Sequence, residues 1–241
     1  MNKKPIRLQK LIAQKTELSR RAAEQLISQG KVSVNGQKVT ILGTKVDPEQ
    51  DKIQVLGYVL RQPDKLIYLA YCKPRGEMVT KEDPQDRPTV WDNLKKWKKS
   101  LNSVGRLDFN SEGLLLLTND GELLNILTHP KHEISKVYEV KVKGCPSTMI
   151  MEKITKGIII DGDLIVPLSL KLIKQGDAAS WLEISITQGK NRVIRRMCEK
   201  VGLEILRLRR TAHGPINLGK MRARQWRHLT SNEIKSLRGI K

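Results

Sequence analysis

The chain has 241 residues, of which 45 are Lys or Arg and 25 are Asp or Glu, so its net charge is +20. A hydrophobic fraction of 39% is ordinary for a protein with a packed core. No apolar run approaches the roughly 18 residues of a membrane-spanning helix, so we expect no membrane segment. The length fits either one large domain or a small domain followed by a larger one.

The positive charge is concentrated in two separate parts of the chain. Residues 1–50 hold ten basic and four acidic side chains, and residues 190–241 hold fifteen and three. Two separated clusters favour a nucleic acid partner over a single solvated basic face. Aromatic residues make up only 4%, so we expect recognition by backbone charge and shape rather than by stacking on successive bases.

The cysteines and histidines predict neither a disulfide framework nor a metal site. The three cysteines are far apart and form no CxxC pair: Cys72, Cys145 and Cys198. The four histidines have no companions at metal-ligand spacing: His129, His132, His213 and His228. The N-terminus, MNKKPIRLQK, lacks the apolar core of a secretory signal. We therefore expect a reduced, cytoplasmic protein without a metal.

The first fifty residues predict two helices followed by a hairpin. Apolar side chains recur at helical spacing over residues 7–14 and 20–29. Ser19 can cap the second helix, and Gly30 follows its last turn. Valines then alternate on both sides of Asn35-Gly36, which is typical of a hairpin with a type I′ turn. Residues 52–64 are expected to form a strand and a connector.

This arrangement, with its core SRRAAEQLISQGKVSVNG, resembles an S4 RNA-binding domain over about 45 residues. A generic basic helical hairpin is the alternative. The resemblance implies that basic side chains of this segment bind RNA, namely Arg7, Lys10, Arg20, Arg21 and Lys31.

From residue 66 onward, strand patterns dominate and helices are interspersed between them. LIYLAYCKP, SKVYEVKVKG, WLEISITQG and LEILRLRR read as strands, and DGELLNILTHP and NRVIRRMCEKVG read as helices. Thr230 and Glu233 form a capping box for a last helix. The sequence thus predicts an α+β protein: a small N-terminal domain over residues 1–60, and a larger domain over 65–241 with a mainly antiparallel sheet and flanking helices.

The stretch GRLDFNSEGLLLLTNDG, residues 105–121, is the most informative motif. It places Asp108 in a turn-rich loop directly before an apolar run that reads as a buried strand. Catalytic side chains are often held where a rigid element meets a loop. An isolated Asp in a polar turn is more often a local turn former, so the motif as a whole has to support a catalytic interpretation.

The motif resembles the central motif of the pseudouridine synthases, in which the Asp is the nucleophile that attacks a flipped uridine. The resemblance implies that Arg106 fills the gap left by the extruded base, although an ion pair or phosphate contact is equally compatible. It also implies that Tyr138, in KVYEV, lies against the target base and takes part in proton transfer; an ordinary core tyrosine is the alternative.

The segment QGKNRVIRRM resembles the late motif of the same family, in which an arginine pairs with the nucleophilic Asp. Helical spacing places Arg192, Arg195, Arg196 and Glu199 on one face. Alignment on Gly189-Lys190 favours Arg195 as the partner of Asp108, and Arg196 remains the alternative. Such a pair would favour the ionised carboxylate and orient it.

Lys73-Pro74 with Gly76 resembles the family's early KPxG motif, which we expect to shape a loop and contact RNA. The resemblance thus adds four basic residues to the RNA-binding set: Lys73, Arg106, Arg192 and Arg196.

Taken in order, these motifs resemble the S4-bearing ribosomal pseudouridine synthases over nearly the whole chain. The resemblance implies a monomeric enzyme without a cofactor that isomerises a uridine of ribosomal RNA, with the large subunit favoured. A noncatalytic S4 factor that binds RNA or the ribosome is the main alternative. An RNA methyltransferase is disfavoured because no GxGxxG follows any predicted strand. The sequence does not indicate which uridine is modified.

Overall fold

The computed structural model describes residues 5–16, 18–60 and 65–240. The chain divides into two compact units, Met1–Leu66 and Ile67–Lys241. The predicted connector over residues 61–64 and the extreme ends of both predicted domains lie outside the described residues. No helix in the described ranges is long and apolar enough to cross a membrane.

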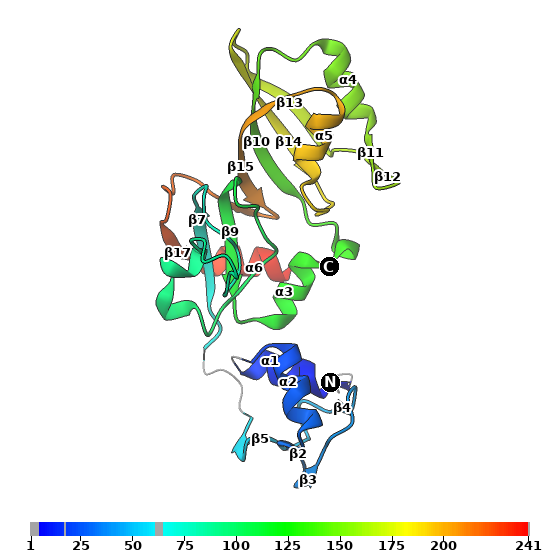
Figure 1. The fold of residues 1–241 in the computed structure, drawn as a ribbon, viewed down its shortest axis with the longest axis vertical. Helices are drawn as coiled ribbons and strands as arrows, with labels where there is room; N and C mark the ends of the chain where they lie inside the picture. Colours follow the sequence, from blue (N-terminus) through cyan, green and yellow to red (C-terminus); the bar gives the residue numbers. More distant parts are fainter. Residues whose placement is uncertain (1–4, 17, 61–64, 241) are drawn as a thin grey trace. The chain divides into compact units, whose positions relative to one another are not determined.

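The N-terminal unit packs two helices against short strands (Figure 1). Its helices are α1 (Leu8–Lys15) and α2 (Arg20–Ser28). Its strands are β1 (Ile6–Arg7), β2 (Val32–Val34), β3 (Gln37–Lys38), β4 (Lys45–Val46), β5 (Ile53–Val55) and β6 (Tyr58–Val59). β1 pairs with β4, and the other four form a sheet in the order β3-β2-β5-β6. Leu8, Ile12 and Ile27 are fully buried in the core.

Local signals predicted this unit correctly. The Ser19 hydroxyl accepts a hydrogen bond from the Ala22 amide at 3.1 Å, as an N-cap should. Gly30 takes a φ of 66° after α2, and Asn35 and Gly36 take φ angles of 52° and 83°. Two consecutive positive φ angles define the type I′ turn that was predicted. Residues 52–60 differ in one respect, because they form a second hairpin, β5–β6, rather than one strand.

The second unit is built around one large mixed sheet with helices on its faces, which confirms the predicted α+β class. Its strands are β7 (Tyr68–Lys73), β8 (Asn102–Ser103), β9 (Glu112–Thr118), β10 (Lys136–Lys143), β11 (Ile158–Ile160), β12 (Asp163–Ile165), β13 (Ser169–Lys174), β14 (Ala179–Ile186), β15 (Ile205–His213), β16 (Ile216–Asn217) and β17 (Trp226–His228). Its α-helices are α3 (Gly121–Thr128), α4 (Thr148–Lys156), α5 (Val193–Lys200) and α6 (Ser231–Arg238). Three short 3-10 helices complete it: η1 (Val90–Asp92), η2 (Lys95–Trp97) and η3 (Pro130–His132).

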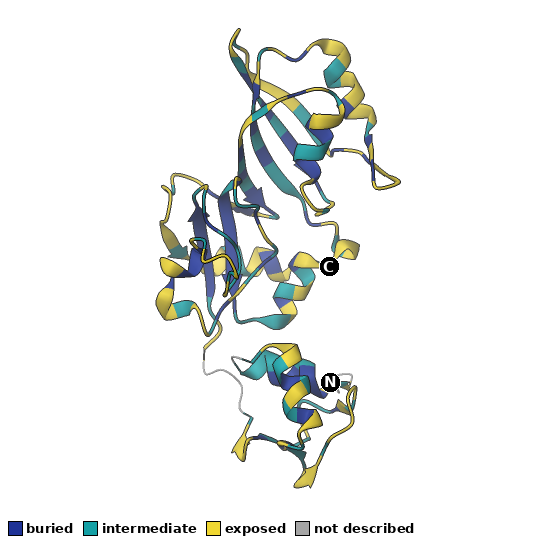
Figure 2. Cartoon of the chain, in the orientation of Figure 1, coloured by how far each residue is buried: buried dark blue, intermediate teal, exposed yellow. Residues whose placement is uncertain are grey.

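The sheet runs in the order β13-β14-β10-β15-β9-β7-β17, with β8 beside β9 and β16 beside β15. The burial of each strand explains its sequence pattern (Figure 2). β9 is apolar throughout because Leu114 and Leu116 pack on one side with α3 and α6, while Leu115 and Leu117 pack on the other with Trp91. β10 alternates because only one of its faces packs against α4 and α5.

One parallel pairing, β15 with β9, joins the strands β13-β14-β10-β15 to the strands β9-β7-β17. β15 runs parallel to β9 with Arg209 opposite Glu112 and Arg210 opposite Gly113, whereas the other paired strands of the sheet are antiparallel. Gly113 has a φ of 105°, and a Cβ placed on it would lie 2.2 Å from the Arg210 carbonyl oxygen. Only glycine permits this approach. The junction bears on the predicted site, because Asp108 lies five residues before Gly113.

We expect Gly113→Ala to destabilise the second unit severely, because the added methyl group collides with backbone in addition to straining φ. The melting temperature should fall by roughly 10 °C or more, as expected for a loss above about 4 kcal/mol. Gly144→Ala is the matched control, since Gly144 has a φ of 68° but a Cβ placed on it would meet nothing within 4 Å. A melting temperature for Gly113→Ala within a few degrees of that control would contradict the proposed backbone constraint.

Candidate active site

A pocket of about 800 Å³ opens where the loop before β9 meets β10, β15 and the segment before α5. This volume lies within the range of small-molecule sites. The pocket brings together residues from three motifs that are distant in sequence: Arg106 and Asp108, Tyr138, and Lys190 with Arg192. The fold therefore gathers four of the predicted site residues around one cavity: Arg106, Asp108, Tyr138 and Arg192.

The loop that carries Asp108 contributes both polar and apolar residues to the pocket wall. Arg106 and Asp108 line the pocket, and Arg106 is exposed whereas Asp108 is half-buried. Leu107 between them also borders the pocket, but it is only 6% exposed and packs with the core beneath α5. This apolar anchor fixes which way its two polar neighbours point.

Lys73, at the end of β7, binds the backbone of the Asp108 loop. Its ammonium donates hydrogen bonds to the backbone carbonyls of Asp108 at 3.1 Å, Ser111 at 2.8 Å and Pro74 at 2.9 Å, and a longer one to that of Phe109 at 3.5 Å. The side chain is fully buried, and burial is the main reason that its pKa is lowered to about 8. The Gly76 amide adds a further bond to the Phe109 carbonyl at 2.8 Å. Hydrogen bonds thus connect the Lys73-Pro74-Gly76 motif with the loop that carries Asp108.

The burial of Lys73 corrects one sequence prediction. We expected Lys73 to shape a loop and to contact RNA, and the first expectation agrees with the structure. The second is wrong, because the ammonium has no exposed surface and its hydrogen bonds go to backbone carbonyls.

Arg195, on α5, binds the same loop. Its Nη2 donates to the Asn110 carbonyl at 2.8 Å and to the Ser111 hydroxyl at 3.4 Å. Burial and the charge of Arg192 lower the pKa of Arg195, and the Asp108 carboxylate acts in the opposite direction. The Asp108 carboxylate thus acts on the charge of Arg195, although the described side chains form no ion pair between them.

Arg196 points elsewhere. Its guanidinium pairs with Asp161 at the turn between β11 and β12, with Nη1 at 2.6 Å from Oδ2. Of the two arginines left open by the sequence, the structure brings Arg195 to the Asp108 loop. Arg192 was expected on the same helical face, but it precedes α5 with a φ of 51° and reaches Glu199 at 3.7 Å.

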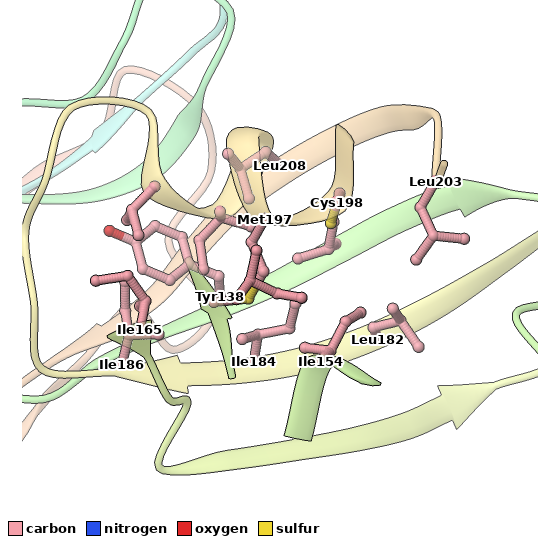
Figure 3. Packing of buried hydrophobic residues seen from close by; sticks show 14 of the residues in the cluster. Tyr138, Ile154, Ile165, Leu182, Ile184, Ile186, Met197, Cys198, Leu203 and Leu208 are labelled. Carbon is pink, nitrogen blue, oxygen red and sulfur yellow. The ribbon is translucent and has the colours of Figure 1, made fainter. Parts of the chain in front are cut away.

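Tyr138 lies on β10, on the face that packs under α5. Its side chain is 9% exposed and belongs to a core cluster that includes Met197, Ile184 and Ile186 (Figure 3). The same side chain also lines the pocket, so it is both a core residue and a wall of the site. Both interpretations of this tyrosine from the sequence are therefore compatible with its position.

The pocket residues that were not predicted include three basic ones on β10 and β15: Lys136, Arg210 and His213. Lys136 precedes Tyr138 by two residues on one strand, so strand periodicity alone could have indicated it. Arg210 and His213 enter the pocket only because β15 pairs with β10, a pairing that no local signal predicts.

The basic residues predicted for RNA binding in the N-terminal unit lie at its surface. Arg7, Arg20, Arg21 and Lys31 are exposed, and Lys10 is half-exposed. Their contact with RNA remains a prediction.

Comparison with known proteins identifies the class to which this fold and site belong. Residues 67–200 match the model of the RNA pseudouridylate synthase family, and residues 6–52 match the S4 domain. The chain therefore belongs to the RNA pseudouridylate synthase family and is a pseudouridine synthase. The match over the catalytic part disfavours the noncatalytic alternative.

Individual relatives cover almost the full length. The chain is 41% identical to the ribosomal large subunit pseudouridine synthase B of Bacillus subtilis, over 97% of this chain and 96% of that protein. It is 35% identical to an uncharacterized RNA pseudouridine synthase of Aquifex aeolicus, over 96% and 93%. A solved pseudouridylate synthase matches with a TM-score of 0.69 at 28% identity, over 96% of this chain and 99% of that chain.

We expect Lys73→Met to separate catalysis from RNA binding, because it leaves buried loop carbonyls without a donor and frees the Asp108 loop. The melting temperature should fall by roughly 5 °C, and the single-turnover rate by about tenfold to a hundredfold. RNA affinity should change by less than about threefold. The exposed Lys153→Gln, on α4, serves as a control for charge removal. A weakened affinity with an unchanged rate would show that Lys73 acts as an RNA ligand instead.

Proposed function

We propose that this enzyme isomerises a uridine of ribosomal RNA to pseudouridine, with Asp108 as the nucleophile. The observation that supports this most strongly is the position of Asp108 in the pocket beside Tyr138, on a loop held by Lys73 and Arg195. Ribosomal RNA is favoured as substrate by the relatives named for it, including the Bacillus subtilis protein.

The chemistry accounts for the residues present. The C1′–N1 bond breaks and a C1′–C5 bond forms on the same base, while the C5 proton is lost and N1 gains a proton. The reaction is an internal rearrangement, so it requires a nucleophile and proton handling but no redox step or group donor. In this proposal Asp108 adds at C1′ or at C6 of the nucleotide, and Tyr138 packs against the base.

The uridine has to leave the base stack to enter the pocket, at a cost of a few kcal/mol. Arg106 is exposed at the rim next to Asp108, where it could occupy the space left by the base. We further propose that the S4 unit binds RNA and that the second unit catalyses the reaction. Basic contacts to phosphates would then offset the cost of flipping.

Replacement of Asp108 by Asn should abolish isomerisation and leave RNA binding intact. Release of tritium from ribosomal RNA labelled at uridine C5 should fall about a thousandfold or more, while affinity stays within about threefold. Asp86→Asn is a matched control, since Asp86 is exposed and has a left-handed backbone that Asn tolerates. Tritium release by the Asp108→Asn protein at the control rate would refute the nucleophile assignment.

Removal of two exposed charges from α2, in Arg20→Gln/Arg21→Gln, should weaken RNA binding without altering single-turnover chemistry on bound RNA. If both side chains contact phosphates, the slope of log K against log salt should decrease by roughly 1.5. The double variant Lys153→Gln/Lys156→Gln removes two exposed charges from α4 and should leave the slope unchanged. Equal slopes in all three proteins would show that α2 does not face RNA.

A further inference from the structure

Three nitrogen-bearing side chains form a cluster on the sheet face that lines the pocket: Lys136, Arg210 and His213, here called the inner basic cluster. Lys136 lies opposite His213, and Tyr138 opposite Arg210, in the antiparallel pairing of β10 with β15. Side chains of opposed residues share one face of a sheet. The cluster therefore lies beside Tyr138 in the cavity that also contains Asp108.

The cluster contains buried donors without partners. Arg210 is 2% exposed; its Nε donates to the Leu114 carbonyl at 2.8 Å, but its Nη2 has no hydrogen-bond partner. His213 is 1% exposed, and although the Leu127 backbone lies close, neither ring nitrogen forms a bond of acceptable geometry. Buried polar groups without partners are rare and costly, so two adjacent ones that line a pocket favour a ligand-binding role.

Lys136 adds a third donor group. Its ammonium donates to the carbonyls of Ile134 at 2.7 Å and Thr187 at 2.8 Å. An ammonium has three N–H donors, so one remains for a ligand in the pocket.

The charges around the cluster are not balanced by acids. The ion pairs formed among the described side chains include neither Lys136 nor Arg210. Burial, followed by the charge of Arg210, lowers the pKa of Lys136 to about 8. Burial, followed by the charges of Arg210 and Lys136, lowers the pKa of His213 well below its usual value. An anion would satisfy both the unpartnered donors and the repulsion between like charges.

We propose that Lys136, Arg210 and His213 bind a backbone phosphate of the RNA next to the uridine that Asp108 reaches. This proposal rests on the proposed function. Phosphate is the anion that RNA carries at every nucleotide, and a guanidinium is well suited to bind it. The uracil carbonyls could accept hydrogen bonds here, but a neutral base would leave the positive charges unbalanced. A cavity of about 800 Å³ is large enough for a nucleotide.

The test compares uridine 5′-monophosphate with uridine, each titrated into the full-length protein by calorimetry or NMR. The wild-type protein should bind the monophosphate at least about tenfold more tightly, since a hydrogen bond to a charged group contributes about this factor. Lys136→Gln and His213→Leu should each lose most of this preference, and the exposed Lys153→Gln should keep it. Melting temperatures show which of these two variants are folded, and one folded variant is sufficient for the test.

Equal binding of the two compounds by the wild-type protein would overturn the proposal, as would an unchanged preference in a folded variant. A loss of uridine affinity as large as the loss of monophosphate affinity would assign the cluster to the base and also overturn it. Tritium release from ribosomal RNA is measured separately. Isomerisation without a phosphate preference refutes only the phosphate site, whereas a phosphate preference without isomerisation refutes only the proposed function.

Discussion

The close approach of β9 to β15 at Gly113 is the constraint on which the catalytic part of the structure depends. The backbone of Gly113 lies against that of Arg210. This pairing joins β9, which follows the Asp108 loop, to β15, which contributes residues to the pocket. Asp108 comes from the loop before β9, whereas Arg210 and His213 come from β15 and Tyr138 from β10. Without the parallel junction, the Asp108 loop and the side chains of β10 and β15 would belong to separate sheets. The site is thus a product of sheet topology more than of any single loop.

Electrostatics acts at two scales in this chain. Over long distances, a net charge of +20 attracts a polyanion irrespective of its sequence. At the site, charge is placed more selectively: Asp108 lies on a loop, Arg195 binds the backbone of that loop, and Lys136, Arg210 and His213 line the pocket. Burial strengthens these local interactions, because they are less screened than those at the surface. In the proposed function, the surface charge would concentrate the RNA and the pocket would select a nucleotide within it.

Sequence reasoning predicted local features well. The cap at Ser19, the turn at Asn35-Gly36 and the capping box at Thr230 depend on side chains within a few residues of the backbone that they serve, so their patterns are visible in the chain. The apolar run of β9 also indicated a strand buried on both faces.

Contacts between distant segments could not be predicted in the same way. The carbonyl bonds of Lys73 span 35 and 38 residues, and the pocket position of His213 depends on the pairing of β15 with β10. A lysine in a motif rich in polar residues suggests solvent and RNA, and only the folded structure shows that it is buried. The choice between Arg195 and Arg196 likewise required the position of Asp161, which attracts one of them away from the Asp108 loop. The hairpin that carries Asp161 was not predicted at all.

The buried ammonium of Lys73 has a consequence for engineering. The segment GRLDFNSEG looks like a portable cassette, yet the conformation of its backbone is maintained by a side chain from β7 and by a glycine contact with β15. Transplanting the segment alone into another sheet would deliver the carboxylate without the framework that aims it. A designer would have to move three strands together, which makes this motif a unit of tertiary rather than primary structure.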